Sequence, residues 1–254
     1  MFVKNKSISM LIMVLAVSLL WCRSARAFFP SDIAIDDTLI QKYGALTSYE
    51  AVITFPSEPG TVLTITRGDN HWQQTFTCNS VTNGTSTAKS VGQHFKTFAQ
   101  CPVNGDLPVS LLQFWIPDNP TSEWKSLGVS NSTRSFGFTD EDMPSFVYGA
   151  EQGDDSSPQI WLDNENFAPI KIVLSSSNVI TFGSYMKFAG FMLPHSGTIK
   201  SGEDTVEFKI EWRGIRQKTS PLFFSESAIK KESGCVEPNG FVFSILKSCL
   251  SLKH

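Results

Sequence analysis

Three of the four histidines are candidates for the imidazole that a general base would need: His71, His94 and His195. A serine hydrolase would carry its nucleophile on a strained Gly-x-Ser-x-Gly turn, and the sequence has no such motif. It also lacks a His-Glu-x-x-His motif, a phosphate-binding loop and a dinucleotide-binding glycine pattern. We therefore expect no enzymatic activity, no catalytic residue and no cofactor, and an exported hydrolase is the least favoured class.

The stretch YMKFAGFMLPHSGTIKSG, residues 185–202, brings a tyrosine, a histidine and a serine close together in sequence. Its spacing is that of a strand that bends at Gly190 and loses a ladder donor at Pro194, which suits a sheet edge or a bulge. Isolated histidines in extended segments are mostly packing or surface residues. We therefore predict that His195 is a structural or rim residue.

Acidic residues gather in three turns, at 140–142, 154–155 and 163–165. A calcium loop would place carboxylates at alternating positions around a glycine, and none of these turns has that arrangement. No Cys-x-x-Cys pair occurs and no histidine stands at zinc-ligand spacing from a cysteine. These patterns predict solvated loops between strands and no metal site.

The first residues have the pattern of a secretory signal peptide. Lys4 and Lys6 form a basic start, an apolar run follows over residues 10–21, and Ser24-Ala25-Arg26-Ala27 supplies an Ala-x-Ala cleavage pattern. The run is too short to span a bilayer. We predict a signal peptide over residues 1–27 and a mature chain that begins at Phe28; the alternative is an uncleaved N-terminal anchor.

Four cysteines follow the predicted signal peptide: Cys78, Cys101, Cys235 and Cys249. An even number of cysteines in an exported chain favours disulfides. Three pairings are possible. We favour Cys78–Cys101 and Cys235–Cys249, because each would close a short local loop.

The formal net charge of the whole chain is −3, although the predicted signal peptide is basic. The mature chain is therefore more acidic than the whole chain. A negative chain is poorly suited to bind nucleic acid or an anionic membrane surface. We expect no nucleic-acid partner.

Beyond the signal peptide the sequence predicts a helix and then strands. Residues 32–43 have helical periodicity, Ser31 can cap their start, and Gly44 ends the run. The period then changes to two: EAVITF, TVLTIT and HWQQTFTC, separated by SEPG and RGDN, predict a three-stranded antiparallel meander.

The middle of the chain breaks this pattern. Residues 79–105 are rich in Ser, Thr, Asn and Gly, and LPVSLLQFWIPD and TSEWKSLGV predict short helices between prolines. We expect a disulfide-bearing insertion at about 79–135 and a short, partly helical, disulfide-bearing tail around Cys235 and Cys249. No internal repeat and no linker divides the chain, so residues 28–254 are expected to form one domain.

Strands resume from SFVYGA onward, with DNEN and SSSN as hairpin signals between PQIWLD, APIKIVL and NVITFGSY. The clearest strand is TVEFKIEW, residues 205–212, whose apolar and charged residues alternate strictly. The sheet is therefore expected to have one apolar and one wet face.

This order of elements resembles the periplasmic lipoprotein-carrier fold of the LolA/LolB-like superfamily of bacterial envelope proteins. The shared features are a strand that ends at Asp163, the NENFA turn, the next strand from Pro169, and the Gly-x-x-x-Pro-His pattern of Gly190, Pro194 and His195. RQKTSPLFFS also resembles a late segment of that family.

The resemblance extends over about residues 32–226 and implies an α+β, mainly β fold. Its long curved antiparallel sheet would form an incomplete barrel, or half-barrel, with the N-terminal helix and the short inserted helices on its concave side. In the carriers, an apolar interior holds lipoprotein acyl chains, and related domains sense lipids or bind a partner. No residue here matches the carriers' functional arginine, so the chain is similar to a divergent member.

The resemblance implies an exported, periplasmic protein that binds a lipid or acylated ligand as a carrier or sensor, in lipoprotein-sorting-like transport. Its partners would be lipid or lipoprotein acyl chains, or another envelope protein. The apolar face either lines a ligand cavity or packs as a core. The candidate lining residues are Leu63, Ile65, Trp72, Phe76, Ile172, Leu174, Phe208, Ile210 and Trp212.

A second function class remains open, that of a structural or protein-interaction module of the envelope with no small ligand. In that class, aromatic residues of the inserted segment would contact a protein partner, because large aromatic side chains dominate many interfaces. Trp115 and Trp124 are the candidate contacts. An open apolar cavity above about 300 Å³ would favour ligand binding over this alternative.

Overall fold

The computed structural model describes residues 29–80, 84–99, 108–116, 118–140, 142–216, 219–230, 238 and 240–251. The chain divides into two units, Met1–Pro30 and Ser31–His254, and the second unit contains all the described helices and strands. The predicted signal peptide lies outside the described residues and stays a prediction. None of the described helices is long and apolar enough to cross a membrane.

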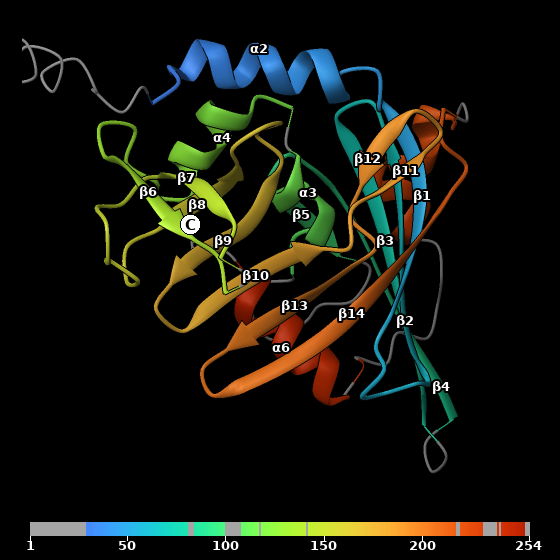
Figure 1. The fold of residues 1–254 in the computed structure, drawn as a ribbon. Helices are drawn as coiled ribbons and strands as arrows, with labels where there is room; N and C mark the ends of the chain where they lie inside the picture. The colour runs from blue at the N-terminus through green and yellow to red at the C-terminus, as the bar shows by residue number, and fades with distance from the viewer. Residues whose placement is uncertain are drawn as a thin grey trace, which may run out of the picture. The chain divides into compact units, whose positions relative to one another are not determined.

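The second unit is built on one antiparallel sheet of 12 strands (Figure 1). Its two edge strands, β5 and β6, do not pair with each other, so the sheet is open. This architecture confirms the predicted fold class, a mainly β incomplete barrel. In spatial order the strands are β5 (Lys96–Ala99), β4 (Gly84–Gln93), β3 (His71–Ser80), β2 (Thr61–Gly68), β1 (Ser48–Thr54), β14 (Asp204–Arg213), β13 (Ser196–Ser201), β10 (Asn178–Gly183), β9 (Pro169–Ser175), β8 (Gln159–Asp163), β7 (Pro144–Tyr148) and β6 (Arg134–Phe138).

A separate two-stranded hairpin and six helical segments complete the described elements. The hairpin interrupts the chain between β10 and β13. Helix α2 begins after Ser31, whose Oγ accepts a hydrogen bond from the Ala34 amide at 3.2 Å, as expected for an N-cap. The remaining bounds are β11 (Met186–Phe188), β12 (Phe191–Leu193), α2 (Asp32–Tyr43), α3 (Leu111–Trp115), α4 (Pro120–Ser126), η1 (Pro221–Phe224), α5 (Glu226–Lys230) and α6 (Phe241–Leu250).

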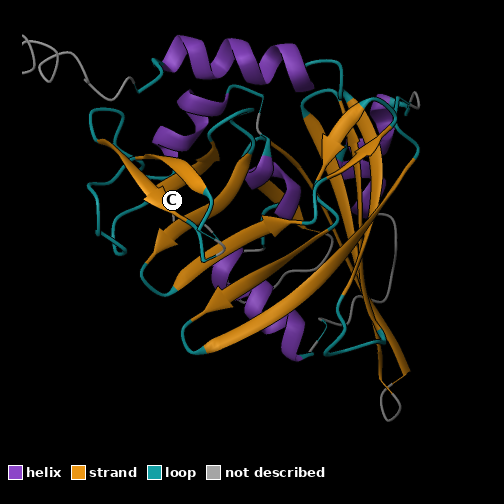
Figure 2. Cartoon of the chain, in the orientation of Figure 1, coloured by secondary structure: helices purple, strands orange, loops and turns teal. Residues whose placement is uncertain are grey.

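Helices α3 and α6 lie within the curve of the sheet (Figure 2). All five residues of α3 are buried, and α6 buries most of its side chains. The Phe243 ring of α6 packs on the Phe76 ring of β3 with centroids 4.9 Å apart, and Trp115 of α3 packs on Trp212 of β14 at 5.7 Å. Much of the concave face is therefore a packed core.

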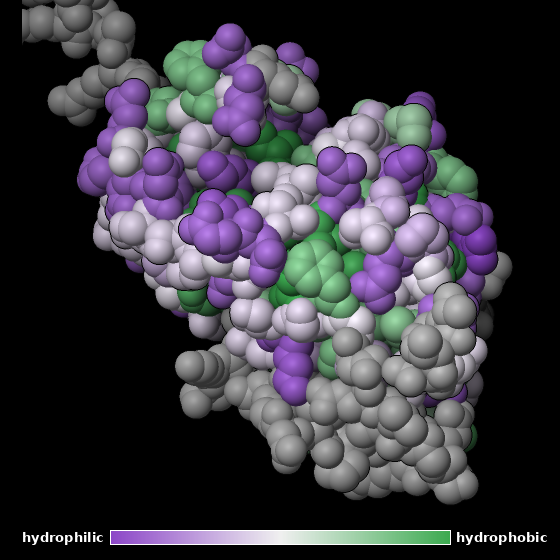
Figure 3. All heavy atoms as spheres, turned by 90° about the horizontal axis from the view of Figure 1, so that it is seen from below, coloured by the Kyte–Doolittle hydropathy of each residue, from purple (hydrophilic) through white to green (hydrophobic). Residues whose placement is uncertain are grey.

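Strand β14 confirms the alternation predicted from the sequence. Val206, Phe208, Ile210 and Trp212 are buried and the residues between them are exposed. Seen from below the view of Figure 1, hydrophilic residues cover much of the surface and hydrophobic ones occupy a smaller central area (Figure 3). One face of the sheet carries the core and the other is wet, as expected for an antiparallel sheet.

The polar segment predicted as an insertion instead extends the sheet in part. Strand β4 pairs with β3 along its whole length, and β5 pairs with β4. The inward positions of β4 include Ala88 and Gly92, which lie opposite Phe76 and Trp72. Small residues leave room for these large rings, but they produce no hydrophobic alternation in the sequence. The strands of residues 84–99 thus belong to the sheet, and the predicted insertion at 79–135 stays a prediction.

Cys78 and Cys249 are buried free thiols, so the described residues give the predicted disulfides no support. Their favoured partners, Cys101 and Cys235, lie outside the described residues. The Sγ atom of Cys78 lies 3.4 Å from a carboxylate oxygen of Glu58, and burial raises the pKa of the Cys249 thiol to about 12. Burial within packed elements therefore accounts for both sulfur atoms.

We expect peptides that contain Cys78 and Cys249 to be alkylated in denaturant without any reductant. Native protein at pH 8 should leave Cys249 unmodified, because the thiolate is the nucleophile and its pKa is raised. Peptide mass spectrometry with and without prior reduction measures both. Alkylation of the Cys78 peptide that depends on reductant would restore the disulfide prediction.

Candidate functional site

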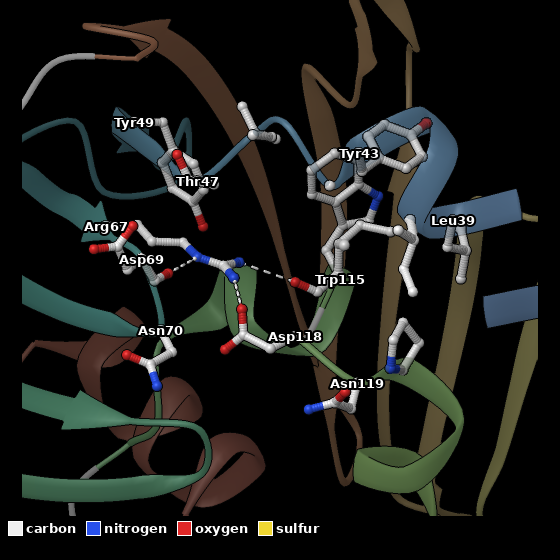
Figure 4. A pocket seen from close by; sticks show the side chains of 15 residues that line it. Leu39, Tyr43, Thr47, Tyr49, Arg67, Asp69, Asn70, Trp115, Asp118 and Asn119 are labelled. Atoms are coloured by element: carbon white, nitrogen blue, oxygen red, sulfur yellow. Dashed lines mark hydrogen bonds and ion pairs between the residues drawn. The ribbon is translucent and has the colours of Figure 1, made fainter. Parts of the chain in front are cut away.

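A cleft opens between helix α2, the link from α3 to α4, and the neighbouring ends of β1 and β2. Its volume is about 570 Å³, which falls in the range of small-molecule sites. Figure 4 shows its two walls, with Leu39, Tyr43 and Trp115 on one side and Tyr49 and Arg67 on the other. Most of its lining is apolar or aromatic.

The apolar wall comes from α2 and α3. Leu39, Tyr43 and Trp115 are its buried members, together with Leu46 from the link between α2 and β1. The Tyr43 and Trp115 rings meet edge to face with centroids 5.3 Å apart. The Tyr43 hydroxyl donates a hydrogen bond to the Met192 carbonyl at 3.0 Å. Burial, followed by the charge of Asp163, raises the pKa of Tyr43 to about 12, so this hydroxyl stays a neutral donor at neutral pH.

The polar wall is organised by Arg67, whose residue surface is only 8% exposed. Its Nε donates to the Asp69 carbonyl at 2.9 Å and its Nη1 donates to the Ile116 carbonyl at 3.1 Å. Its Nη2 pairs with Oδ1 of Asp118. One guanidinium therefore ties strand β2 to the link between α3 and α4, and both charges of the pair are at least partly buried.

Sequence reasoning missed Arg67, although a signal for it exists. Leu63, Ile65 and Arg67 occupy alternate positions of β2, and all three are buried. A cation in an inward series needs a partner, because an unpaired buried charge is costly. The partner, Asp118, is far away in sequence and could not be identified by spacing.

The predicted lining residues lie outside this cleft. Leu63 and Phe76 border a cavity of about 20 Å³ beneath α6, and Phe208 borders a separate groove on the other side of the sheet. Leu174 is half-buried beside a register shift of β9. The other five are buried: Ile65, Trp72, Ile172, Ile210 and Trp212. The ligand-binding role of all nine predicted lining residues stays a prediction.

Both aromatic contacts expected of an interaction module are buried, which corrects that expectation. Trp124 of α4 is fully buried, with its ring 5.8 Å from that of Tyr148. Trp115 donates its indole N–H to the Tyr185 hydroxyl at 2.9 Å. Both rings are buried in the core, so neither is exposed for contact with a protein partner.

The acidic turns are structural where the structure describes them. Oδ1 of Asp154 accepts from the amides of Ser156 and Ser157, and Oδ1 of Asp163 accepts from the amides of Glu165 and Asn166. Hydrogen bonds from Ser157 and Ser156 lower the pKa of Asp154. His195 sits between β12 and β13 and takes part in backbone hydrogen bonds to Gly183 and Ile210, consistent with the predicted structural role.

A second hollow, of about 650 Å³, runs along the other side of β8, β9, β10, β13 and β14. Its surface is mixed: Lys171 lies over the Trp161 ring at 4.6 Å, and the Thr181 and Thr198 hydroxyls share a hydrogen bond. Glu207 and Lys209 also line it. Both hollows have charged residues in their lining, and the cleft beside α2 differs in having one wall of buried apolar and aromatic side chains, among them Leu39, Tyr43 and Trp115.

No family model and no curated protein matches the chain. Among solved structures, the chain is similar to a LolA superfamily protein from Nitrosomonas europaea, with 10% sequence identity and a TM-score of 0.46. It is also similar to a DUF1329 family protein from Desulfovibrio piger, with 10% identity and a TM-score of 0.38. Each comparison covers 79% of this chain and 100% of the other.

Proposed function

We propose that this protein binds the acyl chain of a lipid or lipoprotein in the cleft beside α2, as a carrier or sensor. The observation that carries the proposal is a cleft of about 570 Å³ with an apolar wall from α2 and α3. Burial of acyl methylenes against such a wall is favourable by about 0.8 kcal/mol each. The polar wall opposite would face the head group or the solvent.

The proposal is for binding and not for catalysis. In the cleft, Arg67 is paired with Asp118. The pKa of Tyr43 is raised, so its hydroxyl is not ionised at neutral pH and cannot act as a general base there. The Arg67–Asp118 pair and the Tyr43 hydroxyl are thus engaged in contacts between elements of the structure. Export, a periplasmic location and an envelope partner belong to the same proposal: export rests on the predicted signal peptide, and the other two rest on the resemblance seen in the sequence.

Helix α2 offers a matched pair of variants that test the cleft. Ile40 lines it and is 55% exposed, whereas Ile33 lies on the same helix outside it and is 73% exposed. We expect Ile40→Gln to retain clearly less lipid than the unmodified protein, because it places an amide against the acyl chain. Ile33→Gln should retain as much as the unmodified protein.

Native mass spectrometry of protein purified from membranes measures retention, and thermal unfolding checks that both variants keep a similar Tm. Exposed substitutions usually change stability by about 0.5 kcal/mol or less. Equal lipid retention by the two variants would place the ligand elsewhere. An unmodified protein that carries no lipid would support the alternative, an interaction module of the envelope without a small ligand.

A further inference from the structure

Three potential metal ligands lie close together beside the Arg67–Asp118 pair of the cleft. His94 lies in the turn between β4 and β5, Asp118 in the link between α3 and α4, and Glu123 in α4. The His94 Nδ1 atom is 3.0 Å from Oε1 of Glu123 and 3.6 Å from Oδ2 of Asp118. All three ligand atoms lie within 4.8 Å of one another.

We propose that His94, Asp118 and Glu123 bind a divalent transition-metal ion of the zinc class. Zinc bonds to histidine nitrogen and carboxylate oxygen are about 2.0–2.2 Å long, so neighbouring ligands of a tetrahedral site lie about 3.3 Å apart. The separations of Nδ1 from the two carboxylate oxygens bracket that spacing. One nitrogen and two oxygens suit zinc better than magnesium, which prefers oxygen, or copper(I), which prefers sulfur.

One carboxylate oxygen of Asp118 makes no hydrogen bond to the described residues and could bind a metal ion. Its Oδ1 pairs with Arg67, whereas its buried Oδ2 accepts no hydrogen bond within the described residues. Buried polar atoms usually have a hydrogen-bond partner. Oδ2 lies 3.6 Å from Nδ1 of His94, which is too far for a hydrogen bond, so within the described part of the chain its capacity to bind a cation is unused. A metal ion at this point would give it a partner.

The Glu123 carboxylate is oriented by hydrogen bonds from two neighbouring residues of the same region. Its Oε2 accepts from Nε2 of Gln113 at 3.1 Å, and its Oε1 accepts from the Asn119 amide at 3.1 Å. Such outer partners orient metal-binding carboxylates in known sites. The second lone pair of Oε1, which now faces His94, remains for the ion.

The backbone and the charge balance also suit a cation. The His94 carbonyl accepts from Nε1 of Trp72 at 3.0 Å, which fixes the turn that carries the imidazole. With His94 neutral, the carboxylates of Asp118 and Glu123 exceed the single positive charge of Arg67 by one. The His94 side chain is 39% exposed, so an ion can enter and a water molecule can complete its coordination.

Isothermal titration of zinc chloride into tag-free, chelator-treated protein tests the site. We expect one zinc ion per chain. His94→Asn should weaken binding at least about 10-fold, because even the loss of an outer-shell partner costs 10–100-fold in affinity. Asparagine suits this position because it tolerates the positive φ of His94, 51°.

The matched control is His71→Asn, which removes an imidazole from the start of β3 without touching the cluster and should bind as the unmodified protein does. Glu123→Gln should weaken binding like His94→Asn. Zinc should raise the Tm of the unmodified protein and of His71→Asn by clearly more than that of His94→Asn. Absence of zinc binding by the unmodified protein, or equal binding by His94→Asn, would overturn the proposal. Circular dichroism of the metal-free variants identifies any that fail to fold. If Glu123→Gln fails to fold, the result for His94→Asn, at a partly exposed position, decides whether the proposal stands.

Discussion

A glutamate in place of Phe208 is expected to abolish the cooperative unfolding transition of this protein. The Phe208 side chain is 1% exposed, and its ring packs against that of Phe182 with centroids 6.0 Å apart. Gly197 lies directly opposite on β13, and any side chain there would meet the Phe208 ring. A buried charge without a partner costs several kcal/mol, comparable with a total stability of about 5–15 kcal/mol.

Thermal unfolding followed by circular dichroism measures this result, with Thr205→Glu as the control. Thr205 lies on the same strand, is exposed, and stands opposite Lys200, so its replacement should leave the Tm almost unchanged. Ile210→Ala, at a second buried position, should cost about 2–5 kcal/mol. If Phe208→Glu instead melted normally but lost bound lipid, Phe208 would line an open cavity and not a core.

The second large effect is expected at Arg67. Arg67→Met should destabilise the protein by about 3–5 kcal/mol, because it leaves the Asp118 carboxylate partly buried without its cation. The double variant Arg67→Met/Asp118→Leu should recover much of that loss, since removing both charges leaves none uncompensated. Denaturant unfolding of the single and double variants gives the coupling between the two residues.

Arg213→Met is the matched control for Arg67→Met. Its guanidinium pairs with Glu211 on the exposed side of β14, where solvent screens the interaction, so its loss should leave the unfolding midpoint nearly unchanged. Equal effects of the two arginine variants would contradict a structural role for the Arg67–Asp118 pair. A single variant, Asp118→Leu, should be as destabilising as Arg67→Met.

Local periodicity made much of the sheet predictable. Residues 32–43 form the predicted helix with the predicted cap, because capping is a property of a few adjacent residues. The alternation of 205–212 and the turn residues between β8, β9 and β10 predicted those strands in the same way. Each of these features is decided within about a dozen residues.

The candidate site depended on tertiary contacts that no local pattern contains. Arg67 of β2 contacts Asp118, which lies 51 residues further along the chain, and His94 contacts Glu123, which lies 29 residues further along. The apolar alternation correctly marked the concave face, but alternation is the same whether helices or a ligand cover it. Only the positions of α3 and α6 show that helices fill much of it.

The pairing of β1 with β14 joins the first and last strands of the sheet in sequence, at the middle of the sheet in space. The hairpins on either side are local, whereas this seam needs contacts between residues 48–54 and 204–213. Contacts of such high sequence separation slow folding, because the chain must lose loop-closure entropy before they form. During synthesis, β1 therefore keeps an unpaired edge until nearly the whole chain has emerged, and in that interval the edge can recruit a strand from another chain.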